Sequence, residues 1–146
     1  NDSHFWTNNI GSALHRTWCG LAFERVCLQH IEQLKKALGI SGVLTNVFSW
    51  QTEADADKGI EKLQIDLLID RNDNVINLCE MKFSEQEYLM TEREATKLRR
   101  RKGNFIEATN TRKAVHITLV TPYGVKQNAH SAIIQNQITL NELFKS

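Results

Sequence analysis

Two apolar runs flank a polar cluster in QIDLLIDRNDNVINLCEMKF, the stretch from residue 64 to residue 83. The runs, residues 63–70 and 75–83, are rich in Leu, Ile and Val, and residues 71–74 between them favour turns. Apolar runs separated by a short turn-forming cluster are typical of a β-hairpin. The stretch therefore predicts two neighbouring antiparallel strands.

Side chains alternate between the two faces of each predicted strand. The alternation gathers most of the charged residues on one face of each strand. These faces carry Gln64, Asp66, Leu68 and Asp70 on the first strand, and Leu78, Glu80 and Lys82 on the second. Asp66 and Glu80 face the same side only if opposed residue numbers sum to an even number, as with a three-residue loop at 72–74 or a bulge. We therefore expect this register. Asp66 opposite Cys79 would separate the two carboxylates.

The composition is that of an ordinary soluble globular protein. The 146 residues are 41% hydrophobic and 24% charged, with a formal net charge of +1, and a chain of this length can bury a core without disulfides or metals. The sequence contains neither a signal peptide nor an apolar run of membrane length. We expect a single domain, residues 1–146, in a cytoplasmic protein without membrane association. The lack of an initiating Met favours a fragment of a longer chain.

The three cysteines, Cys19, Cys27 and Cys79, lack the paired spacing that binds metals. On a helix, Cys19 and Cys27 would lie about 12 Å apart, which is too far for a disulfide. We therefore expect reduced thiols that fill the core, as in an intracellular protein.

A long helix is expected over residues 13–38, with Ser12 as its cap and Gly39 beyond its end. Apolar residues recur along it with helical spacing: Leu14, Trp18, Leu21, Leu28 and Ile31. Glu24 lies in line with this stripe, so its carboxylate is expected to point inward. An inward carboxylate needs a partner. Glu24 is therefore either part of a functional site or half of a structural ion pair.

The rest of the chain predicts further elements: a strand over 43–50, an exposed acidic loop over 51–62, a helix over 84–108, strands over 115–121 and 132–138, and a helical turn over 141–144. Ser84 and Glu87 match the capping box expected at the start of a helix. A strand, a helix and a strand in succession imply a crossover. The strands over 75–83 and 115–121 should therefore be parallel neighbours.

A block of basic residues follows the hairpin: Arg93, Lys97, Arg99, Arg100, Arg101 and Lys102. Four of them, Arg93, Lys97, Arg100 and Arg101, would lie roughly along one side of the predicted helix. We expect these four to contact the phosphates of a nucleic acid, and the alternative is an ordinary solvated helix face.

The hairpin carries a pattern of residues suited to magnesium chemistry. Mg²⁺ prefers oxygen ligands, and one or two carboxylates together with a substrate phosphate complete its site. Asp66 and Glu80 would supply carboxylates, and the backbone carbonyl of Met81 would supply a further oxygen. Lys82 could stabilise charge on a phosphate or orient and deprotonate a water. The pattern predicts phosphodiester hydrolysis; the alternative is that Glu80 and Lys82 are neighbouring surface charges.

In this order, the residues resemble the signature of the PD-(D/E)xK nuclease superfamily: an Asp, a spacer, then Glu or Asp, any residue, and Lys. Asp66 matches the Asp, Glu80 and Lys82 match the E-x-K, and Glu24 matches an acidic residue that many members carry on the first helix. The resemblance implies a three-layer α/β/α restriction-endonuclease-like fold. Its mixed sheet has four to five strands, and its core has the order αβββαβ.

A narrower likeness covers about residues 12–144. FE at 23–24, QIDLLID at 64–70 and CEMKF at 79–83 look like the nuclease-like C-terminal domain of certain prokaryotic AAA-type ATPases. This likeness implies a nuclease-like domain with an ATPase module on the same longer chain.

The hypothesis from the sequence is a Mg²⁺-dependent deoxyribonuclease in which Mn²⁺ can substitute. Asp66, Glu80, Lys82 and Glu24 would be its catalytic residues, with Asp66, Glu80 and Met81 as metal ligands and DNA as the partner. Two alternatives stay open. One is a catalytically inactive nuclease-fold module that binds nucleic acid or regulates an attached ATPase. The other is a protein-interaction domain whose basic helix docks an acidic partner.

Overall fold

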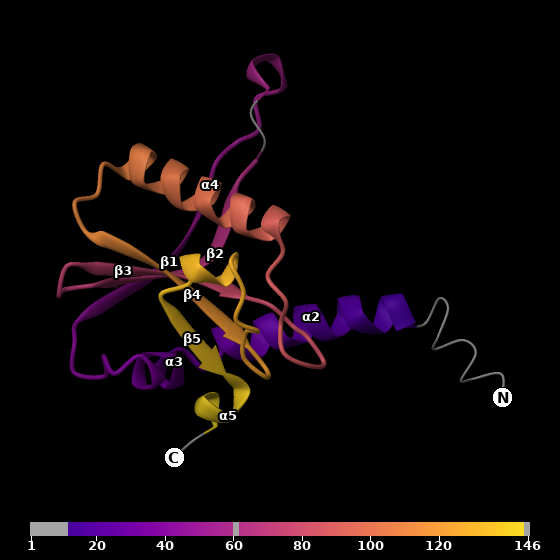
Figure 1. Ribbon diagram of the computed structural model, residues 1–146. Coiled ribbons are helices and arrows are strands. Elements are labelled where there is room, and N and C mark those ends of the chain that lie inside the picture. Colours follow the sequence, from indigo (N-terminus) through magenta and orange to yellow (C-terminus); the bar gives the residue numbers. More distant parts are fainter. Residues whose placement is uncertain (1–11, 60–61, 145–146) are drawn as a thin grey trace, which may run out of the picture.

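One mixed sheet of five strands runs through the centre of the protein (Figure 1). The computed structural model describes residues 12–59 and 62–144. The strands lie in the sheet in chain order: β1 (Thr45–Gln51), β2 (Gln64–Arg71), β3 (Val75–Met81), β4 (Ala114–Thr121) and β5 (Asn136–Thr139). The first three are antiparallel neighbours, whereas β4 is parallel to β3 and β5 is parallel to β4. The predicted parallel pairing of β3 with β4 is confirmed.

Helices cover both faces of the sheet, which gives three layers (Figure 1). On one face lie α2 (Ser12–Leu28), α3 (Ile31–Ala37) and α5 (Leu140–Leu143), and on the other lies α4 (Glu92–Thr109). The core divides in the same way. Phe23 and Leu143 pack with Cys79 of β3, whereas Phe105 packs with the adjacent Leu78. The predicted three-layer α/β/α fold is confirmed.

The central hairpin has the register that the sequence predicts. Leu67 lies opposite Cys79 and Leu68 opposite Leu78, so opposed residue numbers sum to an even number. The loop between β2 and β3 is residues 72–74, and its last residue, Asn74, has a positive φ of 68°. Asn adopts this left-handed conformation more readily than most residues. The turn chemistry thus fixes the pairing that brings Asp66 and Glu80 together.

A bulge in β2 breaks the alternation that was predicted for this strand. Phe48 of β1 pairs with Leu68 and Trp50 pairs with Ile65, so two residues of β2, 66 and 67, lie opposite one residue of β1. As a result, Ile65 and Leu68 pack in the same core cluster, although strict alternation would put them on opposite faces. The predicted strict alternation, with Ile65 and Leu68 on opposite faces of this strand, is therefore wrong. The extra residue of a bulge reorients the side chain beside it.

The predicted helix over 13–38 is two helices, and its inward face was assigned wrongly. The helix is interrupted at residues 29–30, between α2 and α3. Leu14, Trp18 and Leu21 are exposed by 64–66%, whereas Phe23 and Cys27 are buried. Figure 1 shows the first turns of α2 running past the sheet. Only the second half of α2 meets the core, and this half includes Glu24.

Helix α4 begins at Glu92, later than the predicted start near residue 84. The Oγ1 of Thr91 accepts a hydrogen bond from the N–H of Glu94 at 3.2 Å, so Thr91 is the N-cap. The segment before it is not helical: residues 85–87 bend, Tyr88 pairs with Val125 in a parallel bridge, and Met90 is buried. Ser84 instead accepts from the N–H two residues on, as in a turn. The bridge at Tyr88 and the burial of Met90 prevent an earlier helix start.

The remaining elements differ from the predictions mainly at their ends. Strand β5 is shorter than the predicted 132–138, because residues 131–133 form a 3-10 turn. The predicted acidic loop contains a 3-10 turn, Ala56–Lys58, and residues 60–61 lie outside the described part of the chain. The three cysteines are free thiols, and Cys27 and Cys79 fill the core as predicted. None of the described helices is long and apolar enough to cross a membrane.

Candidate active site

The candidate site lies where β2 and β3 stop pairing. Their paired residues run from Asp70 and Ile76 to Leu67 and Cys79, although both strands continue further. Asp66 and Glu80 are the next residues along. On its other side, β3 stays paired with β4, since Glu80 lies beside Leu119 in the parallel register. The central strand is therefore held on one side and released on the other, at the end that carries the charged residues.

The backbone carbonyl of Met81 points toward the released side. The N–H of Lys82 donates to the carbonyl of Val120 in β4 at 2.9 Å. In a trans peptide, the C=O of one residue and the N–H of the next point in opposite directions. The carbonyl of Met81 therefore points away from β4 and toward the β2 side, where Asp66 lies. The carbonyl that was predicted as a third metal ligand is therefore on the same side of β3 as the β2 strand.

Glu24 and Asp66 contact each other through their carboxyl groups. A side-chain hydrogen bond joins them, and such a bond requires one of the two to carry a proton. The pKa of Glu24 is raised to about 7, most of all by burial and then by the bond to Asp66 and the nearby charges of Asp66 and Glu80. The positive charge of Lys82 lowers the pKa of Glu24. Glu24 therefore exchanges its proton near neutral pH.

Two cations converge on one oxygen of Glu80. Arg101 Nη1 lies 2.9 Å from Glu80 Oε1, and Lys82 Nζ lies 3.5 Å from the same atom. Lys82 also lies 3.4 Å from Glu94 Oε2. The Glu80 side chain is 15% exposed, so these ion pairs are partly shielded from solvent. A shielded pair is stronger than a surface pair because water screens it less.

Reasoning from sequence missed Glu94 and gave Arg101 a different partner. These residues are seven positions apart on α4, so they lie on the same side of the helix and face β3. The seven-residue spacing of two opposite charges was a usable signal, but only the fold shows that both face Glu80 and Lys82. The other predicted phosphate contacts, Arg93, Lys97 and Arg100, are exposed on α4.

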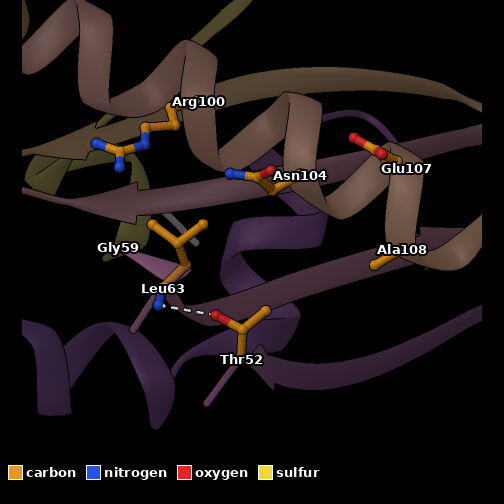
Figure 2. Close-up of a pocket in the computed structure, with 7 residues that line it drawn as sticks. All are labelled: Thr52, Gly59, Leu63, Arg100, Asn104, Glu107 and Ala108. Atoms are coloured by element: carbon orange, nitrogen blue, oxygen red, sulfur yellow. Dashed lines mark hydrogen bonds between the residues drawn. The ribbon is translucent and has the colours of Figure 1, made fainter. Parts of the chain in front are cut away.

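A cleft of about 550 Å³ borders the same helix (Figure 2). Arg100, Asn104 and Glu107 line its α4 side, and Figure 2 shows Thr52 and Leu63 across from them. The N–H of Leu63 donates to Thr52 Oγ1 at 3.0 Å, which holds the two ends of the β1–β2 connection together. The residues that line this cleft do not include the charged group around Glu80. Among the four predicted phosphate contacts, Arg100 belongs to this cleft.

The residues around Glu80 suit a hard divalent cation. Four carboxyl groups meet two cations there: Glu24, Asp66, Glu80 and Glu94, with Lys82 and Arg101. The excess of oxygen donors and negative charge is what Mg²⁺ prefers. In residues 12–59 and 62–144, no group of three or more His, Cys, Asp or Glu side chains could hold a metal ion. A Mg²⁺ site here would therefore use the two carboxylates Asp66 and Glu80, the Met81 carbonyl and waters or phosphate.

Comparisons with known proteins give a distant structural likeness. No protein-family model matches the sequence, and no curated protein matches it. The crystal structure of a protein of unknown function, AF1548, is similar, with a TM-score of 0.49 and 13% sequence identity. The likeness covers 77% of this chain and 56% of that one, so the chain spans little more than half of AF1548. A likeness of this strength carries no argument about function.

Proposed function

We propose that the protein is a Mg²⁺-dependent nuclease-type domain of the PD-(D/E)xK kind that hydrolyses phosphodiester bonds of DNA. One observation carries the proposal. Glu24, Asp66 and Glu80, from α2, β2 and β3, are close enough to raise the pKa of Glu24 together, and Lys82 acts on the same carboxyl group. Perturbed titrating groups gathered from separate elements are more typical of a functional site than of a solvated surface.

The donor set supports a metal position between β2 and β3 in this proposal. Asp66, Glu80 and the carbonyl of Met81 would hold Mg²⁺, which when bound polarises a phosphate and lowers the pKa of a bound water. The excess negative charge around Glu24 is the feature of this site that favours a cation. Gln64 Nε2 donates to Asp66 Oδ1 at 2.6 Å and so orients the first of these carboxylates.

Lys82 is the catalytic lysine in this proposal. Its ammonium lies between Glu80 and Glu94, at 3.5 and 3.4 Å, so its position is fixed before substrate arrives. A fixed cation beside a phosphate stabilises the negative charge that develops on the phosphate oxygens, without reorganisation during the reaction. Glu24, with its pKa near 7, would hold or release a proton beside Asp66 at the working pH.

The exposed side chains of α4 provide the contacts to the nucleic-acid backbone. Arg93, Lys97 and Arg100 are exposed and lie along one stripe of α4. Contacts of this kind supply affinity and orientation and carry no choice of sequence. An ATPase module on the same chain and a cytoplasmic location remain parts of the proposal that come from the resemblance and the free thiols.

A second candidate is a nuclease-fold module that binds nucleic acid without cleaving it. The observation that favours it is the double ion pair at Glu80, because an oxygen held by Arg101 and Lys82 is not available to a metal. The two candidates agree on the partner and differ on the reaction.

Cleavage assays separate the two candidates. The purified protein would be incubated with labelled duplex, single-stranded and junction DNA in Mg²⁺, Mn²⁺ or EDTA, and the products sized. We expect cleavage with either metal, none in EDTA, and none from the Glu80→Gln or Lys82→Ala variants. Matched controls are Glu53→Gln and Lys58→Ala, whose side chains are exposed on the β1–β2 connection. DNA binding without cleavage in either metal would support the second candidate and overturn the first.

A further inference from the structure

We propose that Arg101 couples the binding of nucleic acid to the binding of the divalent cation. Without nucleic acid, the guanidinium of Arg101 occupies Glu80. A backbone phosphate gives Arg101 a new partner and leaves Glu80 free for the cation. The inference rests on the proposed function, since it concerns the regulation of the same site.

Arg101 and Glu80 form a close ion pair. The bond from Arg101 Nη1 to Glu80 Oε1 is 2.9 Å, the length of a strong charge-assisted hydrogen bond. The two side chains are 24% and 15% exposed, so the pair is partly removed from water. Lys82 Nζ, at 3.5 Å from the same oxygen, is the more distant of the two cations. Arg101 is therefore the main occupant of this oxygen.

Arg101 and a divalent cation exclude each other at Glu80. The proposed metal site needs this carboxylate, and a third positive charge next to Arg101 and Lys82 would be repelled by both. Like charges a few ångströms apart still repel each other strongly at the effective dielectric constant of a protein surface. The cation therefore binds weakly until one of the two side chains moves. Lys82 has a second carboxylate, Glu94, that keeps it in place.

A phosphate is the partner that suits Arg101 when it leaves Glu80. A guanidinium binds phosphate through the same planar fork of donors that binds a carboxylate. Arg101 follows Arg100 on α4 and lies one turn after Lys97, and both of these side chains are exposed. A nucleic-acid backbone that follows this basic surface passes beside Arg101. The exchange of one anionic partner for another needs only a change of side-chain rotamers.

Such an exchange makes the two ligands cooperative. If nucleic acid raises the affinity for the cation by some factor, the cation raises the affinity for nucleic acid by the same factor. Couplings between sites are commonly about 5-fold to 150-fold, and the loss of a single competing ion pair places this one near the lower end. The proposed nuclease would therefore bind its metal ion at Glu80 only weakly until DNA is present.

The first test measures the metal alone. Mn²⁺ binding to metal-free protein would be followed by the electron paramagnetic resonance signal of free Mn²⁺, in wild type and in Arg101→Gln. We expect Arg101→Gln to bind Mn²⁺ about fivefold to tenfold more tightly. Arg99→Gln, an exposed arginine of the same helix, is the matched control and should resemble wild type. Arg101→Lys should fall between the two, since it keeps the charge and loses the fork.

The second test measures the coupling. The affinity for a short fluorescein-labelled duplex would be determined by fluorescence anisotropy at increasing Mn²⁺ concentrations. The titration would be run at low temperature, and the length of the duplex would be checked afterwards to show that it was not cleaved. Mn²⁺ should tighten DNA binding in wild type and in Arg99→Gln, and should have little effect in Arg101→Gln.

The outcomes separate the inference from the proposed function. If Mn²⁺ binds wild type and Arg101→Gln equally, and Glu80→Gln abolishes that binding, the inference is wrong and the metal site stands. If none of these proteins binds Mn²⁺, or Glu80→Gln binds it normally, both the inference and the proposed site are wrong. Melting temperatures of all variants establish that each is folded.

Discussion

Glu24 and Asp66, from a helix and a strand that are well separated in the sequence, share a hydrogen bond between their carboxyl groups. The pairing is one of the causes that raise the pKa of Glu24, together with burial and the charge of Glu80. It joins the second half of α2 to the point where β2 leaves β3, and so completes the site around Glu80. Several consequences can be measured.

Glu24 should make stability depend on pH. Its pKa is raised from an ordinary 4.5 to about 7, mainly by burial. Between these values the folded state binds more protons than the unfolded state, so the free energy of unfolding falls as pH rises through this window. Above pH 7 the loss of stability from ionising Glu24 is complete. Glu24→Gln, free of metal, should therefore be more stable than wild type at pH 8, by on the order of 1 kcal/mol after solvent screening.

The check is urea unfolding of both proteins at pH 4 and pH 8 in EDTA. At pH 4 the two should be nearly equal, because Glu24 is protonated in both states. A difference that is the same at both pH values would show that packing, and not titration, separates the two proteins.

Thr91, and not Ser84, should cap α4. The Thr91→Ala variant loses the hydrogen bond to the N–H of Glu94 and should lose about 1 kcal/mol of stability. Ser84→Ala is the matched control, and its cost should be a few tenths of a kcal/mol, as is usual for surface substitutions. Thermal unfolding of the two variants gives the comparison. A larger loss of stability in Ser84→Ala than in Thr91→Ala would instead support a helix that starts near residue 84.

Asn74 should tolerate Gly and resist β-branched residues. Its φ of 68° is easy for Gly and strained for Val. We expect Asn74→Gly to be near neutral and Asn74→Val to cost about 1–3 kcal/mol. Because this loop sets the register, hydrogen exchange at β2 and β3 should also quicken in the Val variant. Equal stability of the two variants would mean that the loop conformation does not fix the hairpin.

Glu94 should act as a positioning residue for Lys82. Glu94→Gln removes the carboxylate that lies 3.4 Å from Lys82 Nζ and leaves the backbone bond to Thr91 intact. If the domain cleaves DNA, kcat should fall about tenfold with KM little changed, because the lysine loses its orientation and DNA contacts remain. Glu92→Gln, exposed on the same helix, is the control. An unchanged kcat would remove Glu94 from the site.

The sequence is enough to predict the hairpin because its register depends on local chemistry. A turn-forming loop and a period of two determine which residues of β2 and β3 lie opposite each other. The bulge at residues 66–67 depends instead on how β2 pairs with β1, which is distant in sequence. Strict alternation cannot anticipate it, although the bulge places Ile65 and Leu68 in the same core cluster.

The helices show the same division between local and distant causes. The inward direction of Glu24 was predicted, but from a stripe that is exposed, because the sequence does not show that α2 extends past the sheet. The pairing of Arg101 with Glu80 depends on the rotation of α4 over the sheet. A basic block gives no indication of which of its members turns toward an acidic residue.

The position of a bound metal tests the central claim most directly. Crystals of wild type and Arg101→Gln would be soaked in Mn²⁺, and anomalous scattering would locate the ion. The proposed site predicts Mn²⁺ between Asp66 and Glu80, within about 2.0–2.3 Å of a carboxylate oxygen of each and near the Met81 carbonyl. The proposed site would be contradicted by Mn²⁺ bound elsewhere. It would also be contradicted if both proteins showed Asp66 and Glu80 well ordered without Mn²⁺ between them.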